Sequence, residues 1–163
     1  MQHTIFLLLG TNLGDKAQNL TTAIELIGKY VGTIRRQSSV YQTAAWGKTD
    51  QPAFFNQALE VETLLAPIAL LQATQLIETK MGRQRKERWG ERVIDIDILL
   101  FEDIRVGTPA LDIPHPELIN RRFALVPLNE IAGSHVHPVY GQTISTLLHQ
   151  CQDKLPVEPV RWS

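Results

Sequence analysis

The sequence predicts an α+β fold in which helices pack on a mainly antiparallel β-sheet. Segments with strand periodicity and segments with helix periodicity follow one another in the order β-α-β-β-α-β. Apolar residues make up 44% and charged residues 20% of the 163 residues, which is ordinary for a globular protein with its own core. The chain shows no internal repeat, linker or low-complexity tract. We therefore expect a single domain over residues 1–163.

The first three elements are a strand, a helix and a strand. Thr4–Leu9 is a continuous apolar run that ends at Gly10, which is typical of a buried strand. Asp15 is a suitable N-cap for a helix that continues to about Lys29, with its apolar residues on one face. Thr33–Tyr41 then has the pattern of a second strand that is polar on one face.

The next three elements repeat this arrangement in the order strand, helix, strand. Phe54–Thr63 alternates in polarity and predicts a third strand. Pro67 suits the first turn of a helix that runs to Met81, and Gly82 suits the position just after it. Val93–Phe101 predicts the fourth strand. The complete order fits a ferredoxin-like split βαβ core.

The remaining residues are expected to form C-terminal additions to this core. They comprise a short strand at Ile104–Val106, a turn at Pro114–Pro116, and helices at Glu117–Leu125 and Thr143–Cys151. Pro156–Ser163 contains two prolines and predicts an irregular tail.

Charge and composition exclude several classes of protein. The net charge is −1, so the sequence does not predict a general polyanion-binding or nucleic-acid-binding protein. One cysteine, Cys151, excludes an intramolecular disulfide and a cysteine-rich zinc site. No stretch is long enough to span a membrane, and Ile5–Leu9 is too short for a signal-sequence core. We expect a cytoplasmic, monomeric enzyme.

Two carboxylates interrupt the fourth predicted strand. Because side chains two apart on a strand point the same way, Asp95 and Asp97 face one side, and the isoleucines around them face the other. Carboxylates are costly to bury without a partner, so this pair calls for a cation. Mg²⁺ is the expected ion, because it is usually held by one or two carboxylates together with water and substrate phosphates. Such a pair can also hold two ions.

A basic segment lies directly before the pair. It contains Arg83, Arg85, Arg88 and Arg92, whose guanidinium groups match phosphate oxygens. This combination favours a site for a metal-bound polyphosphate. The alternative is structural: an acidic strand face that meets a basic loop in salt bridges.

The segment Arg88–Leu99, which reads RWGERVIDIDIL, resembles the signature of the 6-hydroxymethyl-7,8-dihydropterin pyrophosphokinases of folate biosynthesis. Other matching segments run from Gly10 to about Leu128. The resemblance implies that ATP donates its terminal pyrophosphoryl group to the 6-hydroxymethyl oxygen of the dihydropterin, leaving AMP. It implies two Mg²⁺ ions as cofactors, and it places catalysis on Arg83, Arg92, Asp95 and Asp97.

The resemblance also assigns the two substrates to residues. The pterin ring is expected between two aromatic side chains with an amide reading its edge, and the implied set is Thr43, Ala44, Trp46, Phe54, Asn56, Asp95 and Phe123. ATP is expected against Leu71, Gln75, Glu78, Arg85, Trp89, Arg92, Ile98, His115 and Arg121.

Several of these residues have plainer interpretations. Without the resemblance, Phe54 and Phe123 are typical core residues, and so are Leu71 and Ile98. His115, between two prolines, is typical of an ordinary hydrogen-bonded histidine. His135 and His137 form a His-x-His pair with no acidic residue close in sequence, and we interpret both as surface residues.

Two other functions fit the same fold. A metal-dependent nucleotidyl transferase also uses paired aspartates, and it would release pyrophosphate in place of AMP. An RNA-binding module is the second alternative, but the sequence lacks its aromatic-rich strand signature and its net charge is slightly negative.

Overall fold

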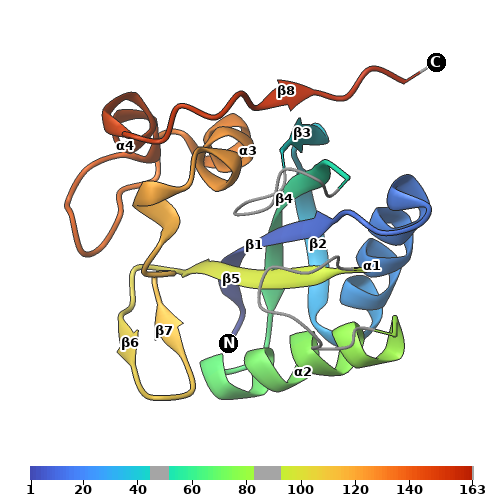
Figure 1. The fold of residues 1–163 in the computed structure, drawn as a ribbon. Helices are drawn as coiled ribbons and strands as arrows, with labels where there is room; N and C mark the ends of the chain where they lie inside the picture. The colour runs from blue at the N-terminus through green and yellow to red at the C-terminus, as the bar shows by residue number, and fades with distance from the viewer. Residues whose placement is uncertain (45–51, 83–92, 163) are drawn as a thin grey trace.

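The computed structural model describes residues 1–44, 52–82 and 93–162. Its core follows the predicted order of strands and helices, and short elements are added after the fourth predicted strand (Figure 1). The strands are β1 (His3–Thr11), β2 (Gly32–Gln37), β3 (Tyr41–Thr43), β4 (Phe54–Thr63), β5 (Asp95–Phe101), β6 (Val106–Gly107), β7 (Asp112–Ile113) and β8 (Glu158–Pro159). The helices are α1 (Lys16–Tyr30), α2 (Pro67–Lys80), the 3₁₀ helix η1 (Leu118–Asn120), α3 (Arg122–Ala132) and α4 (Ile144–Gln150).

The main sheet has the order β5-β1-β4-β3-β8, and β2 also pairs with β4. Every pairing in it is antiparallel. Strand β1 is central, and β5 forms one edge of the sheet. The predicted α+β class with a ferredoxin-like core is confirmed.

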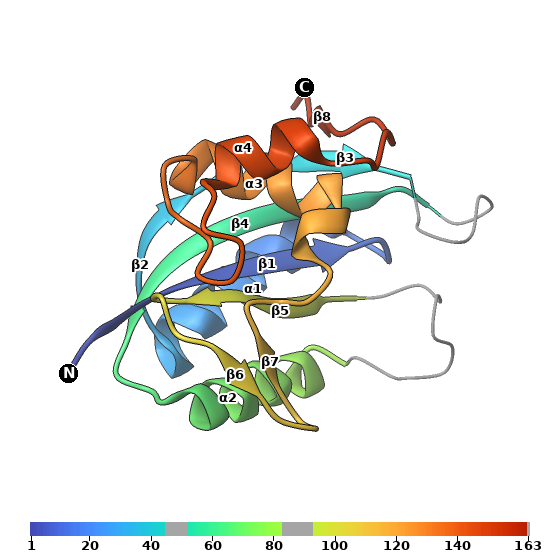
Figure 2. The same ribbon diagram turned by 90° about the vertical axis from the view of Figure 1, so that its left-hand side faces the viewer.

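Helices cover both faces of this sheet (Figures 1 and 2). Ile5, Leu7 and Leu9 of β1 point toward α1 and α2, whereas Phe6 and Leu8 point toward α3 and α4. Because successive strand residues alternate between faces, one continuous apolar run supplies both cores. We refer to the two sides as the α1/α2 face and the α3/α4 face.

The second strand, predicted at Thr33–Tyr41, ends at Gln37, and a separate strand β3 begins at Tyr41; Ser38 interrupts the pairing between them. The backbone N–H of Ser38 donates to Ala58 O at 2.9 Å, and its hydroxyl accepts from Ala58 N at 2.9 Å. The side chain thus takes the place of a ladder carbonyl, and pairing restarts at Tyr41. The strand pattern alone does not reveal this competition between side chain and backbone.

Other boundaries also differ from the prediction. Strand β1 continues through Gly10 to Thr11, whereas it was expected to end at Leu9. Strand β5 begins at Asp95, two residues later than expected. The short strand lies at Val106–Gly107 and pairs with the unpredicted β7. The helix expected at Glu117–Leu125 is instead η1 followed by α3, which continues to Ala132 although Pro127 lies inside it. Burial of one face of α3 outweighs the hydrogen bond that Pro127 cannot donate.

The end of the chain is largely irregular, as predicted, but it also contains a short strand that was not predicted. Glu158 and Pro159 pair with β3, opposite Gln42 and Tyr41. Helix α4 agrees closely with the prediction, because Thr143 caps it by accepting from Thr146 N at 3.1 Å. Among the described residues, no helix is long and apolar enough to cross a membrane.

Candidate active site

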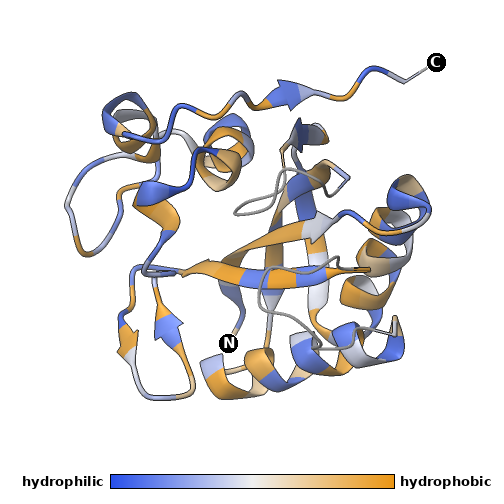
Figure 3. Ribbon diagram, in the orientation of Figure 1, coloured by the Kyte–Doolittle hydropathy of each residue, from blue (hydrophilic) through white to orange (hydrophobic). Residues whose placement is uncertain are grey.

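The paired carboxylates lie on the α3/α4 face. Ile96 and Ile98 belong to the core on the α1/α2 face, so Asp95 and Asp97 point the opposite way and remain partly exposed. The alternation of polar and apolar residues along β5 is visible in Figure 3. The sequence prediction that these two carboxylates share a face is therefore correct.

A β-bulge directly follows the pair. Phe6 is opposite Leu100 and Leu7 is opposite Ile98, so Leu99 is an extra residue in β5. Leu99 O accepts from His115 N at 3.0 Å. This hydrogen bond fastens the loop that carries His115 to the strand that carries Asp97.

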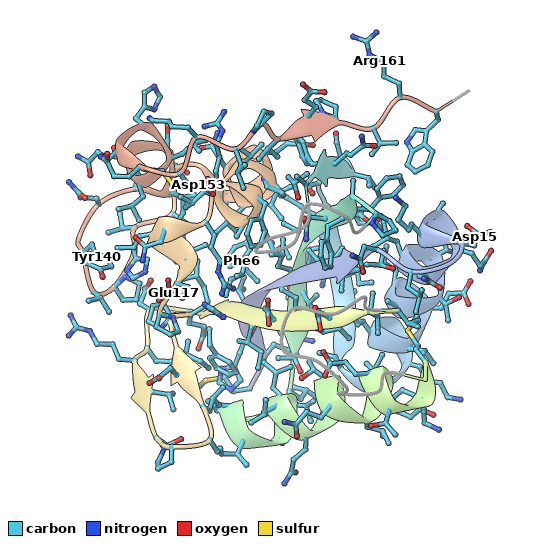
Figure 4. The ribbon with its side chains drawn as sticks, viewed as in Figure 1. Phe6, Asp15, Glu117, Tyr140, Asp153 and Arg161 are labelled. Carbon is cyan, nitrogen blue, oxygen red and sulfur yellow. The ribbon has the colours of Figure 1, made fainter. Side chains whose placement is uncertain are left out.

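His115 is poised as a hydrogen-bond donor. Its Nδ1 accepts from Glu117 N at 3.1 Å, so in the neutral ring the proton is on Nε2. Burial lowers the pKa of His115, and Arg121 lowers this pKa further, whereas Asp97 opposes the shift. Figure 4 labels Glu117 near the end of β5 where this loop passes. A neutral His115 offers Nε2–H to an anion such as phosphate.

Arg121 and Phe123 stand at the start of α3. The guanidinium carbon of Arg121 is 5.7 Å from the centroid of the Phe123 ring, a cation–π arrangement. Phe123 is partly buried and packs against the core of the α3/α4 face. Arg121, His115 and Asp97 interact electrostatically, so the structure brings together three predicted phosphate-binding or metal-binding residues from different segments.

A polar amide lies on the same face, two strands away. Asn56 is 4% exposed, and its Nδ2 donates to Leu9 O at 3.2 Å. Its Oδ1 accepts from Thr43 Oγ1 at 3.5 Å. A primary amide has two N–H groups and two lone-pair directions, so these bonds fix its orientation and leave one donor and one acceptor direction for a ligand.

Gly10 lies between the amide and the carboxylates. In the sheet register it is opposite Asn56 on one side and Asp95 on the other. A Cβ at this position would be 3.0 Å from Asn56 Nδ2 and 3.8 Å from Phe54 Cδ1. The missing side chain lets Asn56 Nδ2 and Phe54 approach the backbone of β1 between Asn56 and Asp95, whose Cα atoms are about 10 Å apart at the usual strand spacing.

Glu78 of α2 supports the edge strand β5 by accepting a hydrogen bond from its backbone. It is buried, and its Oε2 accepts from Ile96 N at 2.8 Å. Ile96 lies between the two aspartates on a strand that, within residues 1–44, 52–82 and 93–162, pairs with β1 alone. Glu78 thus supplies the hydrogen bond that a further strand would otherwise provide.

Not every predicted residue joins this group. Ile98 is 5% exposed in the core of the α1/α2 face, and Leu71 packs against the same core, away from the carboxylates. Gln75 is exposed on α2, and Ala44 is exposed after β3. Arg83, Arg85, Arg88, Trp89, Arg92 and Trp46 lie outside the described residues.

The interpretation of His135 and His137 as surface residues is wrong for His137 and incomplete for His135. His137 is 2% exposed, and its Nδ1 accepts from Val139 N at 3.1 Å. His135 is partly buried, with its Nε2 3.6 Å from Asp103 Oδ1. Asp103 is distant in sequence, so sequence proximity did not reveal this acidic neighbour.

Sequence reasoning assigned no role to Gly10 or to the capping of α3. The signal for Gly10 was available, since glycine inside a strand often marks a close approach of a ligand or another chain segment. Its neighbours across the sheet depend on strand order, which only the fold supplies.

The donor set suits Mg²⁺. Asp95 and Asp97 are hard oxygen ligands on one strand face, and Mg²⁺ commonly takes one or two protein carboxylates and fills its other positions with water and phosphate. Among the residues that the structure describes, no group of three or more His, Cys, Asp or Glu side chains is placed to hold a metal ion.

The fold resembles solved structures of larger proteins. The A437G form of the HPPK-DHPS protein of Plasmodium falciparum, crystallised with SDX-DHP, superimposes with a TM-score of 0.77 at 21% sequence identity. The match covers 92% of this chain and 45% of that chain. At this identity the likeness shows the fold alone.

Sequence relatives are closer. A 2-amino-4-hydroxy-6-hydroxymethyldihydropteridine pyrophosphokinase of Bacillus subtilis is 42% identical over 132 residues, covering 80% of this chain and 79% of the relative. One of Haemophilus influenzae is 39% identical over 151 residues, covering 92% and 94%. The folic acid synthesis protein fol1 of Schizosaccharomyces pombe is 38% identical over 157 residues, which are 96% of this chain and 21% of that protein.

Fold and sequence together define a class, the transferases that move a phosphate-containing group on a ferredoxin-like sheet. A sequence profile of the 7,8-dihydro-6-hydroxymethylpterin pyrophosphokinases (HPPK) matches residues 6–133. The chain belongs to this family. Its reaction is the transfer of pyrophosphate from ATP to 6-hydroxymethyl-7,8-dihydropterin in folate biosynthesis, which excludes the nucleotidyl-transferase and RNA-binding alternatives.

Proposed function

We propose that this protein carries out pyrophosphoryl transfer on the α3/α4 face of its sheet, with Asp95 and Asp97 holding two Mg²⁺ ions. The observation that carries the proposal is the row Asn56, Gly10 and Asp95 across three strands, with His115 beside Asp97. This row has an amide at one end, a glycine in the middle and a carboxylate at the other end. A heterocycle that bears a reactive alcohol fits this spatial arrangement, with the ring toward the amide and the alcohol toward the carboxylate.

The pterin binds over Gly10 in this proposal. Asn56 reads the donor–acceptor edge of the ring with the hydrogen-bonding directions that Leu9 O and Thr43 leave open. Phe54 and Phe123 lie against the two faces of the ring. Asp95 then stands near the hydroxymethyl group, and backbone groups of Thr43, Ala44 and Trp46 complete the site.

ATP binds at the β5 edge of the sheet. The Nε2–H of His115 and the guanidinium group of Arg121 donate to phosphate oxygens, which agrees with the tautomer that Glu117 N selects. Arg83, Arg85, Trp89 and Arg92 belong to the basic segment outside the described residues and are assigned to the triphosphate from the sequence. Leu71, Gln75, Glu78 and Ile98 are assigned to the nucleotide from the sequence. Leu71 and Ile98 pack in the α1/α2 core, so their role in this proposal is to support α2 and β5 and not to contact ATP.

The chemical step moves a pyrophosphoryl group. The hydroxymethyl oxygen of the pterin bonds to the β-phosphorus, and the bond from this phosphorus to the α,β-bridging oxygen breaks. AMP leaves with the bonding electron pair, and the alcohol releases its proton. Mg²⁺, when bound, neutralises charge on the phosphates. The side chains position the alcohol in line and stabilise charge on the phosphate oxygens.

Product analysis tests the proposal. With ATP, Mg²⁺ and the hydroxymethyl dihydropterin, we expect AMP and pterin diphosphate in equal amounts and ADP near background. An ATP analogue with a methylene group between the α- and β-phosphates should bind without reacting, since the bond to be broken is missing. Formation of ADP together with a pterin monophosphate contradicts attack at the β-phosphorus. Full turnover after removal of divalent ions with EDTA contradicts the Mg²⁺ requirement.

We also propose that residues 1–163 act as one domain, and that the protein is monomeric and cytoplasmic. The two cores share the strands of a single sheet, which supports one folding unit. Size-exclusion chromatography with light scattering tests the monomer, since a dimer would have twice the chain mass of 18.4 kDa.

A further inference from the structure

Residues 151–162, which we call the C-terminal strap, contact the start of α3 and strand β3, which lie on either side of the proposed pterin site. The strap lies beyond the residues 6–133 that match the family profile. In Figures 1 and 2 it runs from α4 past α3 and reaches the edge of the sheet at β3. Segments far apart in the sequence are thereby tied to one short stretch of chain.

The first contact is at the start of α3. The N-cap position of this helix is Arg121, whose side chain makes no capping hydrogen bond. Asp153 replaces that cap from a distance: its Oδ2 accepts from Arg122 N at 3.1 Å, and its Oδ1 accepts from Leu155 N at 3.0 Å. Figure 4 shows Asp153 beside α3. A carboxylate here satisfies an N–H group that the helix cannot and complements the positive end of the helix dipole.

The second contact is on the opposite side of the site. Pro159 and Glu158 pair with Tyr41 and Gln42, and Val160 N donates to Val40 O at 2.8 Å. Tyr41 is in turn opposite Asn56. Further along, the Trp162 ring meets the Phe55 ring edge to face at 5.9 Å. The strap therefore fixes the strand beside the pterin-reading amide.

We propose that Asp153 is a positioning residue for the pterin site. By holding the first turn of α3, it sets the position of Phe123 against the face of the bound ring. The inference rests on the proposed placement of the pterin between Phe54 and Phe123. Asp153 itself touches no substrate; it acts through Arg122 N and through the strap that continues to β8.

Steady-state kinetics of Asp153→Ala tests this role, with Thr143→Ala as the matched control. Both variants remove a helix N-cap, but Thr143 caps α4, which carries no proposed site residue. We expect Asp153→Ala to raise the KM for the pterin about five- to tenfold while kcat changes less, because the loosened turn weakens ring binding. Thr143→Ala should lower the melting temperature similarly and leave this KM unchanged.

Asp153→Asn gives an intermediate case. Asparagine keeps one acceptor oxygen and so satisfies one of the two N–H groups, and its pterin KM should lie between those of the wild type and Asp153→Ala. If Asp153→Ala has the pterin KM of the wild type while Phe123→Ala has a raised one, the positioning role of Asp153 is overturned, but Phe123 stays in the site. Unchanged values in both variants also remove Phe123 from the site. The formation of AMP and pterin diphosphate by the wild type in the same assay tests the proposed reaction independently of both of these results.

Discussion

The backbone of the sheet determines the direction in which individual side chains of the site point. Asp95 and Asp97 share a face because they are two apart on β5, and His115 reaches Asp97 because its N–H bonds to the bulged Leu99. Charge of opposite sign gathers here from β5 and from the segment before α3. A substitution that keeps the shape of a side chain but removes its charge should therefore lower turnover without destabilising the fold.

We expect Asp95→Asn and Asp97→Asn each to lower kcat on the order of a hundredfold or more, because a lost metal-positioning charge costs several kcal/mol of transition-state stabilisation. The melting temperature should change little, since both side chains are partly exposed. Turnover with saturating ATP and Mg²⁺ measures the effect. Asp103→Asn, an exposed change away from the site, is the control; normal turnover in a folded Asp95 or Asp97 variant removes that residue from the metal site.

At the scale of secondary-structure elements, a missing side chain in β1 and a supporting side chain from α2 both shape the proposed site. Strand β1 has Gly10 where a side chain would meet Asn56 Nδ2, and β5 depends on Glu78 of α2 at its edge. Gly10 is opposite Asp95, and Glu78 accepts from the residue that follows Asp95, but neither Gly10 nor Glu78 is a proposed metal ligand. Each predicts a measurable difference between two variants of similar size.

Gly10→Ala should weaken pterin binding about tenfold or more, because the added Cβ lies 3.0 Å from Asn56 Nδ2 and displaces the amide. ATP binding should be unaffected. Isothermal titration calorimetry with each ligand gives both values. Gly28→Ala is the matched control: nothing lies within 4 Å of a Cβ there, and it should stabilise α1 by about 0.5–1 kcal/mol. Equal pterin affinity in the two variants would show that Gly10 is not part of the site.

Glu78→Ala should destabilise the protein by about 1–3 kcal/mol, because the Ile96 N–H group loses its acceptor in a buried position. Glu78→Gln retains an acceptor oxygen and should lose much less. Urea unfolding at pH 7.5 would give both values. If the two variants unfold at the same urea concentration, the hydrogen bond to Ile96 does not support the edge strand.

The whole molecule is a single sheet whose two faces have different tasks. The α1/α2 face is a closed apolar core, whereas the α3/α4 face combines a core with the polar row of the site. The fold lowers the pKa of two histidines, His115 and His137. Burial lowers the pKa of His115 and of His137; Arg121 adds to the shift of His115, and His135 and Arg105 add to that of His137.

These lowered pKa values predict acid sensitivity. Below the ordinary histidine pKa of 6.5 the unfolded chain binds protons that the folded chain resists, so the free energy of unfolding should fall as pH decreases through this value. The slope is at most about 1.4 kcal/mol per pH unit for each histidine. Urea unfolding between pH 5 and pH 8 measures it, and His137→Gln should flatten the curve. A curve with the wild-type slope in His137→Gln would assign the acid sensitivity to other groups.

The sequence alone determined the fold class, the central strands, both core helices and the carboxylate pair. These features depend on local rules: periodicity of two for a strand, 3.6 for a helix, a capping Asp15, and Gly82 after α2. The family signature lay within a short continuous segment and predicted the reaction.

Only the tertiary structure decided which distant groups meet. Ser38 divides a strand because Ala58 lies opposite, α3 passes through Pro127 because one of its faces is buried, and part of the tail becomes β8 because the β3 edge can pair with it. Asp153 likewise caps a helix that begins 31 residues before it. Such contacts depend on strand order and packing, which no local pattern encodes, because their energies arise between segments that the sequence keeps apart.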